Sequence, residues 1–486
     1  MKVFLLYPPI TKKERYSSVL GNAGGEQIPL GVFYLSAYLK NYGYDTKVLD
    51  AEAEEYTEDI VVKLISDFGA DIVGISSTTV AFFRALNVAK LIKMEKQNIP
   101  IVLGGPHISS NVNHAMSFKC FDFGILHEGE QTLLELVQKL DRKKMIDFFD
   151  IQGLAHRDRG EVIVNNTREY IKDLDTLPFP DYSQIDDISL YAPAAFNYKT
   201  LPVINIITSR GCPYECTFCD RNTFGRNIRF RSAKNVFEEI KYLYDNYQVR
   251  EIAFVDDTFL LKKQRIFDLF RLLDVAGIKI VWSCMSRINA VDYNFLSFIK
   301  SKGCWSISFG IESGNQKILK LIKKAIDLKS TREVISMCYK LGIKTKGFFI
   351  VGHPSETLKT IKETRDFALS VKLNDIVCTI NTPIPGSPQY KDLDKYGDCE
   401  RSDWSKFNYW NPVFVPFGLT KDVLLREHKK FYRSFYLRPR ILLEYFFRFF
   451  GKGGLRRFIA VVKSSLFLFI RRGGKNYQKN RVSSRL

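Results

Sequence analysis

Three cysteines lie close together in the segment TSRGCPYECTFCDRN, as Cys212, Cys216 and Cys219. Thiolates at such a spacing can bind a metal ion or an iron–sulfur cluster, but a structural zinc site normally closes with a fourth ligand, and none is evident nearby. A [4Fe-4S] cluster that is held by three cysteines leaves one iron open to bind a small molecule. The missing fourth cysteine therefore favours a reactive cluster, while zinc with a distant ligand and a chance grouping of thiols stay as alternatives.

The remaining cysteines and the start of the chain indicate a reducing compartment. Nine cysteines are an odd number, and those outside this segment are scattered singly, as buried apolar thiols commonly are. The N-terminal sequence MKVFLLYPPITKKER predicts a strand that runs into a turn rather than a signal peptide. We therefore expect a cytoplasmic protein.

Residues 1–140 alternate short apolar runs with amphipathic stretches, which predicts a β-α domain. Helices are expected at 30–41, 58–68, 82–96 and 130–140, and the buried strands between them favour a doubly wound, flavodoxin-like parallel sheet. Ligands of such sheets bind outside the carboxyl ends of the strands. The loops at these ends contain Tyr7, Pro8, Ser76, Ser77, Thr78, Thr79, Gly104, Gly105, Pro106, Glu128 and Gly129. Together they predict a ligand site, although any single loop could serve only to turn the chain.

A second β-α series occupies residues 201–400, after a linker at 141–200 that contains a hairpin around Arg159-Gly160 and the extended run LPFPDYS. Six apolar runs alternate with amphipathic segments such as 234–247, 262–275, 290–301 and 329–341. Six strands are too few for a closed eight-stranded barrel, so we expect an open, partial (β/α)6 TIM-like barrel with its site at the carboxyl ends of the strands. The three cysteines follow the first of these strands.

The positive charge of the chain is concentrated near its end. Residues 421–486 hold 18 Lys and Arg against 3 Asp and Glu, whereas the rest of the chain holds 54 against 50. The region 401–486 is expected to be mainly helical and amphipathic, and its apolar runs stay below the length of about 18 residues that spans a bilayer. We expect it to lie on an anionic membrane surface. A helix packed on the protein and a nucleic-acid-binding arm are the alternatives, and the heavy aliphatic content argues against nucleic acid.

The cysteine motif resembles the signature of the radical S-adenosylmethionine (SAM) superfamily, in the spacing C-x3-C-x2-C and in Phe218 before the last cysteine. Further segments resemble the cobalamin-binding branch, which includes anaerobic magnesium-protoporphyrin cyclases and hopanoid methylases. They are AFVDDTF, WSCMSRIN, SFGIESGN, GFFIVGHPSET and TPIPGSPQY. The N-terminal domain resembles the cobalamin-binding domains of that branch, so the resemblance covers roughly residues 1–400.

The resemblance implies three cofactors and a set of site residues. Cys212, Cys216 and Cys219 would hold a [4Fe-4S] cluster whose open iron binds SAM, which reductive cleavage converts to a 5′-deoxyadenosyl radical. Arg287, Glu312 and Ser313 would lie near the methionine part of SAM, and the backbone of Ile350 and Gly352 near its adenine. Tyr390 joins Glu312 among the candidate catalytic residues, and Asp256 and Asp257 would face the substrate.

Cobalamin would bind against the strand-end loops of the first domain, as this resemblance implies. The D-x-H-x-x-G motif that supplies a histidine to cobalt is absent: His107 follows GGP but lacks the flanking Asp and Gly. Many cobalamin-dependent radical enzymes bind the cofactor without that histidine. We therefore expect His107 and His127 to be polar loop residues rather than ligands.

The leading functional hypothesis is C-methylation of an unactivated carbon in a lipid-like or other small-molecule substrate, with a reductant such as flavodoxin or ferredoxin. A radical oxidative cyclase or rearrangement enzyme, a non-catalytic cobalamin- or metal-binding sensor and a basic membrane-surface scaffold are the alternatives. A methylthiotransferase is disfavoured because that family carries a second cysteine triplet upstream, and only Cys120 precedes residue 212. The expected location is the cytoplasm, with peripheral attachment to the inner face of the cell membrane.

Overall fold

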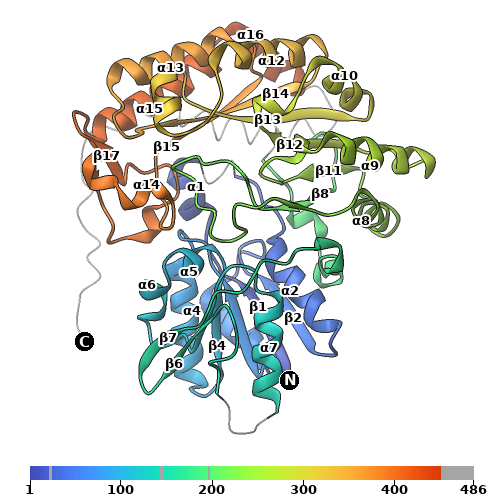
Figure 1. The fold of residues 1–486 in the computed structure, drawn as a ribbon, viewed down its shortest axis with the longest axis vertical. Helices are drawn as coiled ribbons and strands as arrows, with labels where there is room; N and C mark the ends of the chain where they lie inside the picture. The colour runs from blue at the N-terminus through green and yellow to red at the C-terminus, as the bar shows by residue number, and fades with distance from the viewer. Residues whose placement is uncertain (21–23, 143–146, 195–196, 450–486) are drawn as a thin grey trace.

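Two parallel β-sheets, each covered by helices, lie one above the other in this protein (Figure 1). The structure is a computed structural model, and it describes residues 1–20, 24–142, 147–194 and 197–449. The N-terminal sheet forms the lower half of Figure 1 and the second sheet the upper half. The segment between them passes across the junction of the two halves.

The first sheet has the strand order of flavodoxin-like folds, as the sequence predicted. Its parallel part runs β2-β1-β3-β4-β5, so strands are added on both sides of β1. The strands are β1 (Lys2–Tyr7), β2 (Asp45–Asp50), β3 (Ile72–Ser76), β4 (Ile101–Gly104) and β5 (Phe123–Ile125). The carboxyl ends of all these strands point toward the second sheet.

Helices bury both faces of this sheet, which explains why most residues of its strands are apolar. On β1, Val3 and Leu5 belong to one apolar core, whereas Phe4 and Leu6 belong to another on the opposite face. The first core includes α2 (Leu30–Lys40) and α7 (Glu130–Asp141), and the second includes α3 (Glu58–Phe68) and α4 (Phe82–Glu95). The four helices expected in this domain are confirmed.

The hairpin that we expected within the linker 141–200 belongs to the first sheet. Its first strand, β6 (Leu154–Asp158), pairs antiparallel with β5, and β7 (Glu161–Val164) pairs antiparallel with β6, so the sheet extends to seven strands. Strand β5 would otherwise expose unpaired backbone groups at an edge, and the hairpin covers them. The short helices α1 (Lys12–Leu20), α5 (Pro106–Ser110) and α6 (Val112–Met116) were not expected from the sequence.

The second sheet is the partial barrel that the sequence predicted. Six parallel strands follow one another in chain order, β8-β11-β12-β13-β14-β15. They are β8 (Val203–Ile206), β11 (Glu251–Phe254), β12 (Val281–Ser286), β13 (Cys304–Glu312), β14 (Lys344–Val351) and β15 (Asp375–Ile380). The intervening helices include α8 (Ala233–Asn246), α9 (Lys263–Val275), α10 (Tyr293–Ser301), α12 (Leu328–Lys340) and α13 (Leu358–Ser370).

Along most of the central barrel strands, buried residues alternate with partly buried ones. On β12, Trp282 and Cys284 are buried, while Ser283 between them is only partly buried. Ser283 lies opposite Ser306 on β13, and Ser308 follows on the same face. Such small side chains do not fill the interior as the bulky layers of a closed barrel do. The barrel interior is therefore suited to accommodate a ligand.

The first part of the basic C-terminal region closes the open edge of the barrel. Helix α15 (Lys421–Tyr436) runs along β15, where the Tyr432 hydroxyl accepts a hydrogen bond from the Cys378 amide (2.9 Å) and donates one to its carbonyl (3.1 Å). The Tyr436 hydroxyl likewise donates to the Ile376 carbonyl (3.0 Å). These hydroxyls satisfy backbone groups of an edge strand. Of the alternatives for this region, a helix packed on the protein is thus the one observed for α15.

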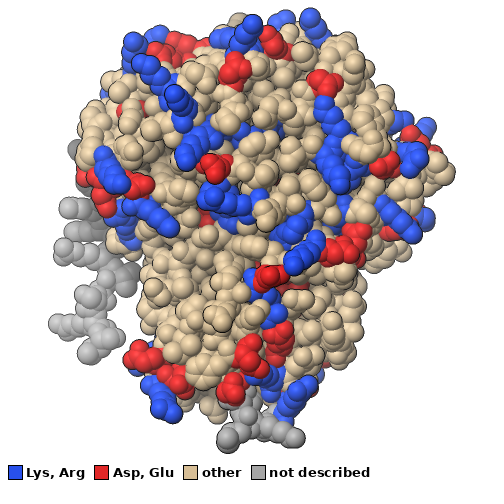
Figure 2. All heavy atoms as spheres, viewed as in Figure 1, with Lys and Arg blue, Asp and Glu red and all other residues tan. Residues whose placement is uncertain are grey.

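The rest of that region is only partly described. Helix α16 (Pro439–Phe449) follows α15, and the basic stretch around Arg456 and Lys463 lies outside the described residues. Among the helices that the structure describes, none combines the length and apolarity that crossing a membrane requires. Basic and acidic side chains intermingle on the face shown in Figure 2, in keeping with the near balance of charges before residue 421.

Candidate functional site

The cysteine loop joins two short strands that pair with each other, β9 (Ser209–Arg210) and β10 (Arg229–Phe230). Cys216 is 7% exposed, Cys212 and Cys219 are partly buried, and all three thiols are free of disulfides. Because the β9–β10 pairing joins the two ends of the loop, the three cysteine side chains are held within one short closed loop. The loop lies at the carboxyl end of β8, where the partial barrel was expected to carry its chemistry.

The environment of the loop favours the protonated form of two of its thiols, those of Cys212 and Cys219, unless a cation is present. Burial raises the pKa of Cys212, and burial together with the nearby Asp257 carboxylate raises the pKa of Cys219 to about 12. Thiolates bind metal, so the positive charge of bound irons would supply the stabilisation that the protein withholds. Within the described ranges, no three His, Cys, Asp or Glu side chains are grouped closely enough to hold a metal ion, and this includes the three cysteines of the loop.

A buried polar network fixes the start of the loop. Asp256, directly after β11, accepts hydrogen bonds from the backbone amide (3.0 Å) and hydroxyl (2.9 Å) of Thr208 and from the Ser209 hydroxyl. Arg265 donates to the Thr208 carbonyl (3.1 Å). Asp256 is fully buried. Asp256 therefore positions the cysteine loop. We had expected it to face a substrate, and it does not.

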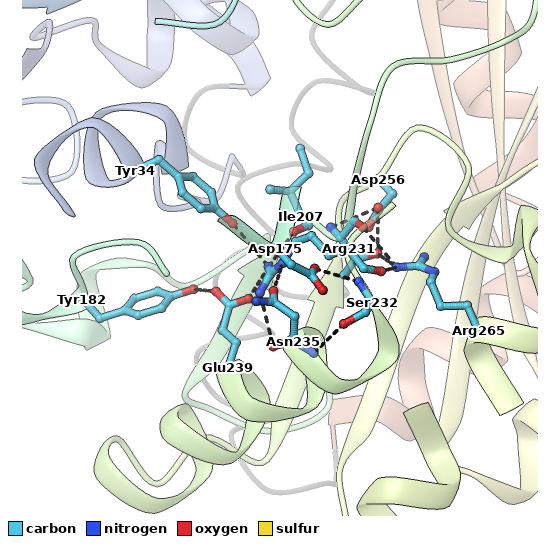
Figure 3. A network of polar contacts seen from close by, with 11 residues as sticks. Tyr34, Asp175, Tyr182, Ile207, Arg231, Ser232, Asn235, Glu239, Asp256 and Arg265 are labelled. Carbon is cyan, nitrogen blue, oxygen red and sulfur yellow. Dashed lines mark hydrogen bonds and ion pairs between the residues drawn. The ribbon is translucent and has the colours of Figure 1, made fainter. Parts of the chain in front are cut away.

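The end of the loop is held by Arg231, at the centre of Figure 3. Its guanidinium donates to the Ile207 carbonyl (3.0 Å) and forms an ion pair with Glu239 on α8. The Tyr182 hydroxyl, from the segment before the barrel, donates to the same Glu239 carboxylate (2.6 Å), and Tyr34 of α2 also reaches Arg231. Residues on both sides of the loop are thus anchored to one network that includes the first domain.

Arg287, which the resemblance assigned to the methionine part of SAM, lies beside the cysteines. Its Nη1 atom is 3.6 Å from the sulfur of Cys216, and its guanidinium stacks on the Tyr214 ring at 3.7 Å. Its Nη2 atom donates to the carbonyl of Lys324. The remaining nitrogen, Nε, is buried without a hydrogen-bond partner. A donor is therefore left available next to the cluster loop.

Glu312 and Lys324 form a buried ion pair next to Arg287. The Oε1–Nζ distance is 2.8 Å, and the residues are 7% and 6% exposed. The backbone of Glu312 is in the left-handed region (φ 68°), which is uncommon for a residue other than glycine. A Cβ atom on Gly310 would lie 2.5 Å from Glu312 Oε1 and 2.7 Å from Lys324 Nζ, so the pair in this arrangement occupies the space beside the glycine. Ser313 is fully buried, and its hydroxyl accepts from the Asn315 amide at the start of α11 (Gln316–Leu321).

The loop after β14 is held by Glu356. Its Oε2 atom accepts from the backbone amides of Gly352 (2.5 Å) and His353 (3.1 Å), and burial raises the pKa of this carboxyl to about 8. Gly352 has a positive φ of 87°, and Ile350 is partly exposed on the inward face of β14. His353 is fully buried, and burial lowers its pKa to about 3.

Buried polar atoms without partners are concentrated at this end of the barrel. Leaving such a group unpaired costs about 1–3 kcal/mol, so a polar ligand or ordered water that pairs with these atoms would be bound favourably there. Those that follow β12, β14 and β15 are Arg287 Nε, both ring nitrogens of His353, Glu356 Oε1, Asn381 Nδ2 and the carboxamide of Gln389. This donor and acceptor set fits SAM, a charged and highly polar molecule.

Three of these residues were missed by sequence reasoning. His353 lies within GFFIVGHPSET, Asn381 directly precedes TPIPGSPQY, and Gln389 lies within it. These three residues therefore lie in or directly beside segments whose resemblance to the cobalamin-binding branch was noted from the sequence. Gln389 also donates its backbone amide to the carbonyl of Thr217, between two of the cysteines (2.8 Å). Tyr390, by contrast, packs against Trp404 and Arg401.

The strand-end loops of the first sheet are hydrogen-bonded among themselves. Gly105 has a φ of 95°, and a Cβ atom there would lie 2.8 Å from the backbone of Ser77. The buried His107 ring contacts the Thr79 hydroxyl and His114, each at 3.3 Å, and burial lowers its pKa to about 3. This places the His107 ring in the interior, within a chain of polar contacts.

The other residues expected to contact cobalamin occupy varied environments. Tyr7 accepts a hydrogen bond from Arg15 (2.6 Å), and Glu128 pairs with both Arg210 (2.9 Å) and Arg229 (2.8 Å) on the strands that flank the cysteine loop. Pro8 is buried, Ser76, Thr78 and Gly129 are partly buried, and Pro106 is exposed. No atom lies within 4 Å of where a Cβ atom of Gly104 would be. Gly104 is therefore a point at which a large ligand could approach the backbone closely.

Comparison with known proteins accounts for both halves of this site. A model of the radical SAM superfamily matches residues 206–368, and a model of the B12 binding domain matches residues 16–137. An uncharacterized methyltransferase of Pyrococcus horikoshii is 32% identical over 453 residues, which are 93% of this chain and 96% of that protein. The chain belongs to the cobalamin-binding branch of the radical SAM enzymes.

Other members of this radical SAM branch agree with that assignment. The anaerobic magnesium-protoporphyrin IX monomethyl ester cyclase of Rubrivivax gelatinosus is 28% identical over 450 residues, 91% of this chain and 78% of that protein. The fold matches the radical SAM methyltransferase TsrM from Kitasatospora setae, solved with cobalamin and a [4Fe-4S] cluster, with a TM-score of 0.65 and 16% identity over 81% of this chain and 74% of that one. The predicted family, its fold and its cofactors are confirmed.

The residues of this radical SAM enzyme fit the three cofactors of its family. The three thiols would hold the [4Fe-4S] cluster, the unpaired polar atoms around Arg287 and His353 would bind SAM, and the loops of the first sheet would bind cobalamin. When bound, the reduced cluster supplies the electron that cleaves SAM to a 5′-deoxyadenosyl radical. The chain itself positions the cysteine loop through Asp256 and Arg231 and holds Glu312 in place through Lys324.

Proposed function

We propose that this enzyme transfers a methyl group to an unactivated carbon, replacing a C–H bond with a C–CH3 bond. The observation that carries the proposal is the direct contact between the two strand-end faces: the Ser110 hydroxyl, beyond β4, donates to Asp220, next to Cys219. A methyl donor on the first face and a radical source on the second would thus both reach a substrate between them. The methyltransferase of Pyrococcus horikoshii is a relative over nearly the whole length of both chains.

A radical oxidative cyclase is the second candidate. It is favoured by the similarity to the magnesium-protoporphyrin cyclase of Rubrivivax gelatinosus, which extends over 91% of this chain. The two reactions differ in their products. Methylation with SAM as the methyl source yields S-adenosylhomocysteine as well as 5′-deoxyadenosine, whereas a cyclase that transfers no methyl group yields only the latter.

The test is an anaerobic reconstitution of the full chain with iron, sulfide and hydroxocobalamin. After desalting, the absorption spectrum reports retained corrinoid and cluster, and a reductant such as flavodoxin, ferredoxin or dithionite starts SAM turnover. Formation of both products supports the methyltransferase. Deoxyadenosine without S-adenosylhomocysteine supports the cyclase, and retained corrinoid without either product would support a non-catalytic sensor.

We further propose a lipid-like substrate and peripheral attachment to an anionic membrane through α16. Leu437, Leu442 and Leu443 are 42%, 51% and 57% exposed, and the basic Arg438 and Arg440 lie between them in the sequence. Exposed leucines next to arginines suit insertion into a negatively charged interface. The enzyme would then take its substrate from the membrane surface.

The membrane proposal needs point substitutions, because removing residues 421–486 would also remove α15 from the barrel edge. Leu442→Glu/Leu443→Glu should release the protein from liposomes that contain an anionic lipid. Exchange of the exposed Val275 (85%), at the end of α9, for Glu is the matched control and should leave binding unchanged. Equal binding of all three proteins to these liposomes would contradict the proposal.

A further inference from the structure

The backbone carbonyl of Asn222 is a point where the two halves of the protein meet. Asn222 follows Cys219 closely, and its carbonyl accepts hydrogen bonds from His127 Nδ1 and from the Tyr170 hydroxyl (2.9 Å). His127 belongs to the loop after β5, and Tyr170 to the segment between the two sheets. Because a carbonyl only accepts, His127 must carry its proton on Nδ1.

Neighbouring contacts enclose the same segment of the cysteine loop. The Asp220 carboxylate accepts from the Ser110 hydroxyl and from the Asn222 amide (2.9 Å). A Cβ atom on Gly386 would lie 2.4 Å from the Asn222 side chain and 2.8 Å from Ser110. The residues that follow the third cysteine are thus packed between the first domain and the loop after β15.

Hydrogen bonds connect His127 to the loops after β3 and β4. The His127 amide donates to the Ser109 hydroxyl (2.9 Å), which donates to the Gly105 carbonyl (3.0 Å). The His107 amide in turn donates to the Ser77 carbonyl (3.1 Å). His127 also has a φ of 63°, a conformation that a side chain other than glycine adopts only when its surroundings hold it there.

We propose that His127 is a positioning residue that couples the cobalamin face of the first sheet to the cluster loop through the Asn222 carbonyl. This inference rests on the binding of both cofactors by the same chain. A cofactor that orders the loops around Gly105 would order Asp220–Asn222, and with them Cys219. The coupling acts in both directions, because a ligand that changes the affinity for a second one is affected by it to the same extent.

The test uses a pair of variants that differ only in the donor. Asparagine tolerates the left-handed conformation and can donate from Nδ2 where His127 donates from Nδ1, so His127→Asn should preserve the contact. In His127→Asp, the aspartate has the same size as asparagine and a similar tolerance for the left-handed conformation, but its carboxylate can only accept hydrogen bonds. Tyr170→Phe removes the other donor without adding charge, and it keeps the experiment informative if His127→Asp folds poorly.

The measurement is the Kd of hydroxocobalamin for cluster-free and for cluster-loaded protein, in the absence of SAM and substrate. We expect the wild type and His127→Asn to bind roughly fivefold more tightly with the cluster, a ratio typical of coupled sites. The ratio should approach one in His127→Asp and fall in Tyr170→Phe. Bound hydroxocobalamin should also slow the loss of iron to a chelator in the wild type and not in His127→Asp.

Three results would overturn the proposal. A wild-type ratio of one would show that the two sites are independent, and an unchanged ratio in both His127→Asp and Tyr170→Phe would show that the Asn222 carbonyl does not carry the coupling. If neither form of the wild type retained hydroxocobalamin, the proposal would fail together with the cofactor assignment. Formation of 5′-deoxyadenosine, measured separately, would then show whether the radical chemistry stands without the corrinoid.

Discussion

The two strand-end faces that meet in this enzyme differ in how their buried polar side chains are hydrogen-bonded. On the barrel face, Arg287, His353 and Gln389 keep buried polar atoms without partners. On the face of the first sheet, the His107 ring is hydrogen-bonded within the domain and Glu128 is paired across the interface. Among the loop residues described there, the Thr78 hydroxyl is a buried group without a partner.

This difference indicates two modes of binding. A ligand at the barrel face gains directional hydrogen bonds, because it satisfies groups that the protein leaves open. A ligand at the first sheet meets backbone, glycine and small side chains, so shape and contact area decide its affinity. Substitutions at the barrel face should therefore act by removing interactions, and substitutions at the first sheet by occupying space.

The largest effect is expected at the cysteine loop. Cys216→Ala removes a ligand that lies 3.6 Å from Arg287, and we expect it to abolish both the absorption of the [4Fe-4S] cluster and the formation of 5′-deoxyadenosine. Cys399→Ala, at a partly buried thiol far along the chain from the loop, is the control and should keep both. Iron and sulfide content after reconstitution is the measurement. A Cys216→Ala protein with full iron content would refute the ligand assignment.

The ion pair of the barrel face comes next. Glu312→Gln leaves the buried Lys324 charge unpaired, and we expect the free energy of unfolding to fall by about 3–5 kcal/mol. In Glu312→Gln/Lys324→Met, stability should largely return because no charge is left buried alone. SAM binding, measured by calorimetry, should stay weak in both variants if Glu312 contacts the ligand. Wild-type affinity in the double variant would limit Glu312 to a structural role.

The contrasting test at the first sheet is Gly104→Ala. The free protein has room for the added methyl group, since no atom lies within 4 Å of its position. If cobalamin approaches the backbone there, its Kd should rise by about tenfold, or ~1.4 kcal/mol, while the thermal stability of the free protein stays unchanged. Gly31→Ala, where nothing lies within 4 Å either, is the matched control. Equal affinities for the two variants would place cobalamin away from Gly104.

The last prediction is a pH dependence of stability that arises from Glu356. Burial raises the pKa of this carboxyl to about 8, whereas in the unfolded chain it is near 4.5. Between these values the folded state binds more protons, so wild-type stability should fall as the pH rises from 5 to 8. The stability of Glu356→Gln should not fall in this way, because glutamine does not ionise. Its stability relative to the wild type, measured by denaturant unfolding of cofactor-free protein, should therefore increase over that range; a constant difference would contradict the raised pKa.

Much of the fold and the chemical core of the site followed from local sequence. The apolar runs of both β-α series predicted the parallel strands of the first sheet and the six strands of the barrel, because buried strands have a distinctive composition. The spacing of Cys212, Cys216 and Cys219 indicated the cluster, since ligands on one short loop need no distant partner. These properties depend only on residues that are close together in the chain.

What only the tertiary structure decided are contacts between residues far apart in the chain. Glu128 was predicted as a ligand-binding residue, but it pairs with Arg210 and Arg229 across the domain interface. The basic region after residue 421 gave no sign that Tyr432 would hydrogen-bond the edge of β15. Local sequence shows that a carboxylate or a strand edge needs a partner, and folding selects which of many candidates comes within hydrogen-bonding distance.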